Sequence, residues 1–252
     1  MPTVPGDPLQ PLLGLAGVDA AAGQARAAVD ALLANPMLRR RSAEVSSESA
    51  LRGARSSAAL DGCDLPLDTV RAGGVDDPIL AGALRASAAV GSLVATWRHA
   101  PMQALARLHL LAAAGILPDD ELGRPTADPQ RSARLAALAA LVTGDTAAPA
   151  VVVAAVVHGE LLAVEPFRAA NGTVARAAAR LTMISRGLDP KAVGVPEVGH
   201  AEQADEYVAA QRSFRTGGAD GVARWLRHCC AAVERGAQEG LAVCEAMRRG
   251  AR

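Results

Sequence analysis

The chain has 252 residues, enough for one large domain or two small ones, and half of them are hydrophobic although only 2% are aromatic. Alanine and leucine favour helix and few segments alternate as strands do, so we expect an all-α protein. The 26 basic residues balance the 26 acidic ones, which excludes the basic surface that non-specific binding of nucleic acid or an anionic membrane requires. We therefore expect neither nucleic acid nor a membrane as a partner.

The N-terminal residues 1–15 contain prolines and no positive region, so they do not resemble a secretory signal. Residues 1 to about 18 are expected to form a flexible arm, because they are rich in proline and glycine. The longest apolar run, residues 147–157, is too short to span a bilayer. These features predict a cytoplasmic protein.

Helices are predicted over residues 20–34, 42–60, 66–71, 78–98, 102–114, 132–142, 149–164, 173–186, 201–214 and 219–249. Residues 115–130 are the least helical interior part, and they predict a surface loop or a small β-hairpin flap. No linker is long or polar enough to require two domains. The N-terminal helices, residues 19–98, are therefore expected to form one compact unit with residues 99–252.

The four cysteines predict reduced thiols. Cys230 and Cys244 lie on one predicted helix about 21 Å apart at 1.5 Å per residue, too far for a disulfide. His228, Cys229 and Cys230 have metal-ligand chemistry, but neighbouring residues of a helix point in different directions. With Cys63, these cysteines are therefore expected to be mostly buried thiols and to hold no metal, as in a cytoplasm.

The stretch from Glu165 to Arg176 joins two predicted helices through a polar turn. The first amides of a helix are unpaired and carry the positive end of its dipole, so such a turn can hold an anion. Arg176 then lies one turn into the second helix. The turn can equally be an ordinary junction in which Asn171 caps the helix.

Residues 165–176 resemble the signature of Fic-family proteins, His-Pro-Phe-x-(Asp/Glu)-Gly-Asn-Gly-Arg-x-x-Arg. Five signature residues keep the family's spacing: Pro166, Phe167, Asn171, Gly172 and Arg176. Family-like features flank them, so the resemblance covers residues 40 to 235: Leu105 to His109, Gly123-Arg124, His158, Tyr207, Gly218 and Trp225. It implies a helical Fic-like bundle and, for typical members, transfer of AMP from ATP to a protein hydroxyl.

A second match lies at residues 57–62. Many Fic proteins carry an inhibitory helix with (Ser/Thr)-x-x-x-Glu-(Gly/Asn), and Ser57, Asp61 and Gly62 fit it except that Asp61 replaces the glutamate. The resemblance implies that Asp61, one methylene shorter, pairs with Arg176 and displaces the γ-phosphate of ATP. The alternative is a plain helix end at Gly62.

Four signature positions differ from the family. Glu165 replaces the histidine that acts as general base, and a carboxylate is a weaker base at neutral pH. Ala169 replaces the acidic residue that holds Mg²⁺ and offers it no oxygen. Ala170 adds a methyl group at the first glycine, and Thr173 removes one of two arginines for the phosphates.

Loss of base, metal ligand and arginine argues against ordinary AMP transfer, because each such group contributes orders of magnitude in rate. The retained Asn171, Gly172 and Arg176 predict a pseudoenzyme with a cradle for ATP or another nucleotide, to which Thr173 at the helix start would also belong. They are equally compatible with a protein whose filled site serves an unknown protein partner. The alternative is a transferase with altered chemistry that uses Glu165 and a phosphate-containing donor such as ATP.

Several roles stay open at this stage. Arg176 is either a ligand contact or a structural ion-pair partner, and Asn171 is either a ligand contact or a cap. His158, two turns before Glu165, is either a packed structural histidine or a substitute base. Abundant small apolar residues on the predicted helices are compatible with a homodimer but do not require one.

Overall fold

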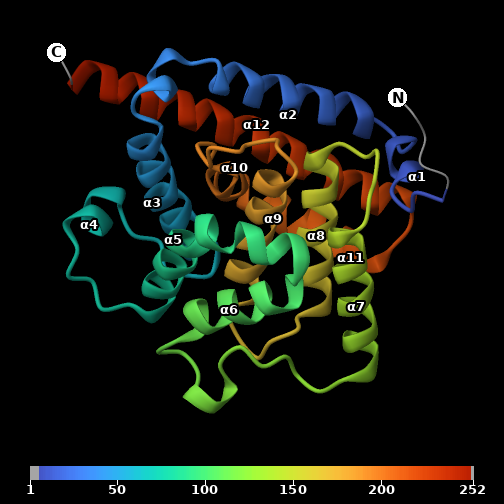
Figure 1. Ribbon diagram of the computed structural model, residues 1–252. Coiled ribbons are helices and arrows are strands. Elements are labelled where there is room, and N and C mark those ends of the chain that lie inside the picture. The colour runs from blue at the N-terminus through green and yellow to red at the C-terminus, as the bar shows by residue number, and fades with distance from the viewer. Residues whose placement is uncertain (1–5, 251–252) are drawn as a thin grey trace.

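The computed structural model describes residues 6–250, and within that range the regular elements are all helices (Figure 1). Their bounds are α1 Gln10–Leu13, α2 Val18–Leu33, η1 Pro36–Arg39, α3 Ser42–Leu60, α4 Leu67–Ala72, α5 Pro78–His99, α6 Pro101–Ala113, η2 Asp119–Glu121, α7 Pro129–Thr143, α8 Ala150–Val164, α9 Asn171–Ser185, α10 Pro196–Glu202, α11 Ala204–Thr216 and α12 Ala219–Gly250. The all-α class predicted from composition is confirmed.

Two helices begin where the sequence places an acidic residue before a proline. Asp77 caps α5 by accepting a hydrogen bond from Leu80 N (2.9 Å), with Pro78 as the first helical residue. Asp128 caps α7 in the same way through Arg131 N (2.8 Å). The helix predicted over residues 201–214 corresponds to α11, but it begins only at Ala204, because the chain breaks at Gln203 and the residues before it belong to α10.

Helix α8 lies in the core and packs against α7, α9, α11 and α12. Most of its residues are buried, which explains why it is apolar on all sides. Two fully buried tryptophans tie neighbouring helices together: Trp225 Nε1 donates to Ala155 O (2.8 Å), and Trp97 Nε1 donates to Thr182 Oγ1 (3.2 Å). The helices around α8 therefore have a fixed relative position.

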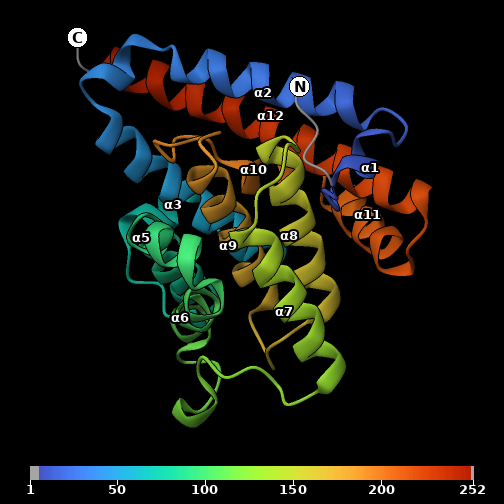
Figure 2. The same ribbon diagram turned by 45° about the vertical axis from the view of Figure 1, so that its right-hand side comes forward.

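Long helices α2 and α12 lie side by side across one end of the molecule in both views (Figures 1 and 2). Helix α3 packs against α5, α10 and α12, and α5 packs against α6 and α9. Helix α5 is long and apolar enough to cross a membrane by length and composition, and 33% of the window concerned is buried among these neighbours. One helix of this kind is weak evidence for a membrane span.

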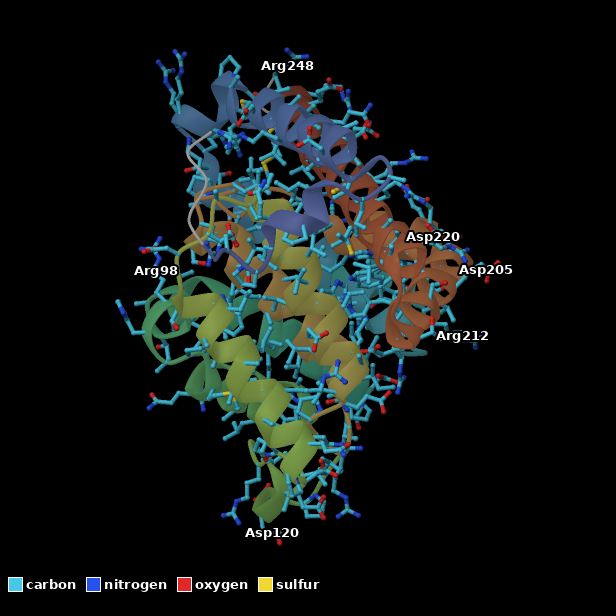
Figure 3. The ribbon with its side chains drawn as sticks, turned by 90° about the vertical axis from the view of Figure 1, so that its right-hand side faces the viewer. Arg98, Asp120, Asp205, Arg212, Asp220 and Arg248 are labelled. Carbon is cyan, nitrogen blue, oxygen red and sulfur yellow. The ribbon has the colours of Figure 1, made fainter. Side chains whose placement is uncertain are left out.

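Charged side chains of both signs project from the outside of the molecule (Figure 3). The labelled examples are Arg98, Asp120, Asp205, Arg212, Asp220 and Arg248. Their mixture matches the equal numbers of acidic and basic residues in the sequence.

Two local expectations differ from the structure. Of the two alternatives predicted for residues 115–130, the structure has the loop and not the β-hairpin: residues 114–128 contain only an isolated bridge between Ala114 and Leu117 and the short η2. Residues 1–5 of the expected arm lie outside the described residues. From Asp7 onward the arm is packed, because Asp7 accepts from Thr146 Oγ1 (2.8 Å) and Leu9 is buried against Val153.

Candidate functional site

The turn between α8 and α9 reverses the chain through two residues with left-handed backbone conformation. Glu165 ends α8 with φ +46°, and Ala170 precedes α9 with φ +57°. A left-handed alanine is strained, which explains why a glycine suits this position in the resembling signature. The first helical hydrogen bond of α9 runs from Val174 N to Ala170 O (3.0 Å), so the amides of residues 171–173 have no partner within the helix.

Asn171 holds this turn closed. Its Oδ1 accepts from Phe167 N (3.0 Å), and its Nδ2 donates to Phe167 O (2.7 Å). The N-cap position belongs to Ala170, and no side chain caps α9. The prediction that Asn171 caps the helix is therefore wrong. Its side chain is used up in fixing the loop.

The buried side chain of Phe167 anchors the turn to α6. It is buried and stacks on His109 of α6, with ring centroids 4.0 Å apart and planes within 4°. Burial lowers the pKa of His109 to about 4, so the ring is neutral and its Nδ1 accepts from Gly123 N (2.9 Å). Thr126 N also donates to Pro166 O (2.8 Å). The turn and the segment 114–128 are thus joined.

Arg176 is buried one turn into α9 and meets the last turn of α3. Its Nη2 forms an ion pair with Asp61 Oδ2 (2.7 Å), so the shorter aspartate still reaches it. Nε donates to Ser57 Oγ (2.9 Å), Nη2 to Ser57 O (3.0 Å) and Nη1 to Tyr207 OH (3.4 Å). Burial opposes the charged form, but the field of Asp61 outweighs it, and the pKa of Arg176 lies above its ordinary value.

The carboxylate of Asp61 lies on the first turn of α9. Thr173 Oγ1 donates to Asp61 Oδ2 (2.7 Å), and a methyl group on Gly172 would overlap Asp61 Oδ1. This is the end of the helix where the dipole and the unpaired amides attract an anion. Gly62 follows with φ +106° and lets the chain leave α3 immediately after Asp61.

A cavity of about 240 Å³ lies beside this helix start. Its wall is apolar on one side and follows the turn on the other, formed by Asp61, Ile79, Ala112, Ile116 and residues 169–173. Ala169 presents only a methyl group to it. Asp61 therefore stands between the cavity and the buried Arg176.

Glu165 and His158 do not share this cavity. The Glu165 carboxylate is half exposed and accepts from Arg215 Nη1 of α11 (3.2 Å). His158 is buried in α8 with Nε2 3.0 Å from Tyr207 OH. The structure thus brings together Ser57, Asp61, Gly172, Thr173 and Arg176, and leaves out the residue at the position of the catalytic base.

Tyr207 is a site residue whose role the sequence alone did not reveal. Its hydroxyl links Arg176 to His158, and burial raises its pKa to about 12. It is the only tyrosine in the chain and one of the family-like features in the sequence, but neither signal gave its hydroxyl a role.

The sequence matches no family model, and it matches no curated protein. Solved structures do match the fold over 90% of this chain. A Fic family protein from Desulfovibrio desulfuricans superposes with a TM-score of 0.70 at 18% identity and is covered over 73% of its length. Fic-1 from C. elegans superposes with a TM-score of 0.69 at 18% identity and is covered over 71% of its length. A Fic domain containing signaling protein from Bacteroides thetaiotaomicron superposes with a TM-score of 0.68 at 11% identity and is covered over 98% of its length. The chain has the fold of these Fic proteins.

Proposed function

We propose that the chain is a Fic-type pseudoenzyme that transfers no AMP and keeps a phosphate-binding cradle for a nucleotide at the start of α9. The observation that carries this proposal is the carboxylate of Asp61, bound to Thr173 and Arg176 on the first turn of the helix. A carboxylate there mimics an anionic ligand, because it accepts from the same positive end of the helix.

The chemistry of transfer lacks its parts in this site. Glu165 is paired with Arg215 outside the cavity, so its carboxylate is held away from any ligand. Ala169 offers no oxygen to Mg²⁺, and phosphoryl transfer relies on that ion to neutralise developing charge. Thr173 gives a hydroxyl where the resembling signature has a second cation. The remaining site suits binding better than catalysis.

Ligand binding requires Asp61 to withdraw. The cavity of about 240 Å³ is smaller than the roughly 300–1,000 Å³ of ordinary ligand pockets. Removal of the Asp61 carboxylate frees both the helix start and the guanidinium of Arg176. The apolar wall of Ile79, Ala112 and Ile116 then offers a surface for a nucleobase.

Thermal unfolding with ATP and ADP, each with and without Mg²⁺, tests the binding proposal on wild type, Asp61→Ala and a control, Asp64→Ala. Asp64 is exposed and pairs with Arg55, which does not line the cavity, so its removal leaves the cradle closed. A ligand at 100 times its dissociation constant adds about 2.7 kcal/mol. We expect a nucleotide to raise the Tm of Asp61→Ala, and to raise the Tm of wild type and Asp64→Ala much less. The absence of any shift in all three would favour a filled site in a protein that binds another protein.

Incubation with labelled ATP, Mg²⁺ and a cell lysate tests the absence of transfer. We expect no labelled protein with wild type or with Asp61→Ala. Labelling by wild type that is absent with Arg176→Ala would overturn the pseudoenzyme proposal. If the labelling is absent with Glu165→Ala as well, the result would support the transferase with altered chemistry. The proposed compartment is the cytoplasm, which the four buried free cysteines support.

A further inference from the structure

A second polar cluster lies in the core where α8, α10 and α12 meet (Figures 1 and 2), and Arg176 of the cradle lies at its edge. His158 of α8, His200 of α10 and Cys229 of α12 are all buried there. One ligand atom from each lies within 4.8 Å of the others. The three side chains line a cavity of about 20 Å³, which is room for one particle the size of a water molecule.

Each histidine has one ring nitrogen engaged with a polar neighbour. His158 Nε2 lies 3.0 Å from Tyr207 OH, and His200 Nδ1 lies 3.0 Å from His228 Nε2. Metal-binding histidines show this pattern, because a partner on the outer nitrogen fixes the ring and its tautomer. The second nitrogen of each ring has no hydrogen bond within residues 6–250, so it is left for a metal.

A fourth group faces the same cavity. Glu197 of α10 is 95% buried, and its Oε2 has no hydrogen-bond partner within the described residues. Its other oxygen lies 3.8 Å from Arg180 Nη1, a distance that satisfies neither group fully. A buried carboxylate oxygen without a partner is costly. Glu197 Oε2 lies near Gly53 of α3 and outside the group of ligand atoms formed by His158, His200 and Cys229, so this side chain has to turn further into the cavity to reach a cation there.

We propose that His158, His200 and Cys229 bind one Zn²⁺ ion, with the carboxylate of Glu197 as the fourth ligand. Two neutral imidazoles, one thiolate and one carboxylate carry a charge of −2 together, so a site of these ligands with tetrahedral Zn²⁺ is neutral. Neutrality matters because Arg176 lines the same cavity, and a site with excess positive charge would be repelled there. A zinc site made of histidines alone would keep the +2 charge of the ion beside Arg176 and would therefore be less favourable.

Binding requires small side-chain movements and the release of one proton. Ligands at 2.0–2.3 Å from zinc are about 3.3–3.8 Å apart in a tetrahedron, so the spread of up to 4.8 Å among His158, His200 and Cys229 must contract, and Glu197 must move in from outside this group. Burial raises the pKa of the Cys229 thiol well above its ordinary value. Zinc therefore replaces the thiol proton: the S–H bond breaks, a Zn–S bond forms, and H⁺ goes to solvent.

The bound ion would couple this cluster to the cradle. A metal on the free nitrogen of His158 keeps its Nε2 protonated, so Nε2 donates to Tyr207 OH. The tyrosine oxygen then accepts from both His158 and Arg176 Nη1 (3.4 Å), which fixes the guanidinium that pairs with Asp61. The coupling is independent of whether the cradle binds a nucleotide.

Expression of the full chain in minimal medium with added Co²⁺ tests the site, because Co²⁺ occupies zinc sites and absorbs when bound to a thiolate. Wild type and Cys230→Ser should carry one metal per chain and the near-ultraviolet thiolate–cobalt band, whereas Cys229→Ser should lose the band. Cys230 is the matched control, since it is the next residue, equally buried and outside the cluster. Tyr207→Phe should keep the band and bind the metal about 10-fold more weakly.

A folded wild type without metal or band overturns the proposal, and so does an unchanged band in Cys229→Ser. If Cys229→Ser does not fold, the decision rests on wild type and on His200→Gln, whose loss of one nitrogen ligand should shift the visible cobalt spectrum. Metal content measured after growth in zinc then gives the native occupancy.

Discussion

Removal of the negative charge of Asp61 should destabilise the protein because Arg176 is buried beneath it. Asp61→Asn keeps the size of the side chain, and it leaves Arg176, 3% exposed, with neutral partners only. The loss of one partner of a buried pair costs about 3–5 kcal/mol. Two features reduce this figure here: the Asp61 side chain is 24% exposed, and Ser57 and Tyr207 still accept from the guanidinium.

We therefore expect the free energy of unfolding to fall by about 2 kcal/mol, which corresponds to about 4–8 °C in Tm for a chain of this size. Urea denaturation followed by circular dichroism measures the change, with Asp30→Asn as control. Asp30 forms an exposed pair with Arg26 on the surface of α2, so its replacement should have no measurable effect. Equal stability of Asp61→Asn and Asp30→Asn would refute the view that Asp61 neutralises a buried charge.

Three further predictions use the same denaturation assay. Gly82→Ala should lower the free energy of unfolding by about 2 kcal/mol, because a methyl group there would overlap Ala112 O. The control Gly23→Ala, at an exposed position, should raise it by about 0.5–1 kcal/mol. Equal effects of the two substitutions would contradict the close crossing of α5 and α6. Ala170→Gly should stabilise the protein by about 0.5–1 kcal/mol by relieving its left-handed backbone, and Ala169→Gly, whose φ is negative, should give no gain. In protein freed of metal by a chelator, the free energy of unfolding should fall as pH drops below about 6.5, by up to about 1.4 kcal/mol per pH unit for each histidine. The reason is that these histidines bind protons in the unfolded chain but stay neutral in the folded one. A flat profile down to pH 5 would contradict the lowered pKa values of His109, His158, His200 and His228.

The fold class and most helices could be predicted because their signals are local. Alanine- and leucine-rich periodic segments are long, and α3 begins and ends at the predicted residues 42 and 60. The start of α7 was missed because Asp128-Pro129 looks like loop sequence, although an acidic cap followed by proline is also a helix start. Whether such a pair begins a helix depends on the residues that follow it, which a short stretch of sequence does not contain.

The candidate site was less predictable, since its contacts join distant residues. Residue spacing gave no reason to place Asp61 on Arg176, and only the resemblance to Fic proteins suggested it. Of the two roles left open for Asn171, the cap is wrong because a capping pattern assumes an ordinary helix entry, whereas two left-handed residues fold the turn back onto Phe167. The cluster of His158, His200 and Cys229 was not foreseen, because each residue comes from a different helix.

The pairing of α2 with α12 has a consequence for biosynthesis. The apolar stripe of α2, which includes Val29 and Leu32, rests on α12, and Arg227 Nη1 donates to Ala16 O across 211 positions of sequence. At about 5–20 residues per second, a ribosome needs roughly 10–40 s to make the intervening chain. During that interval α2 lacks α12, its main partner, so most of its apolar side stays uncovered by its native neighbour until the last helix emerges.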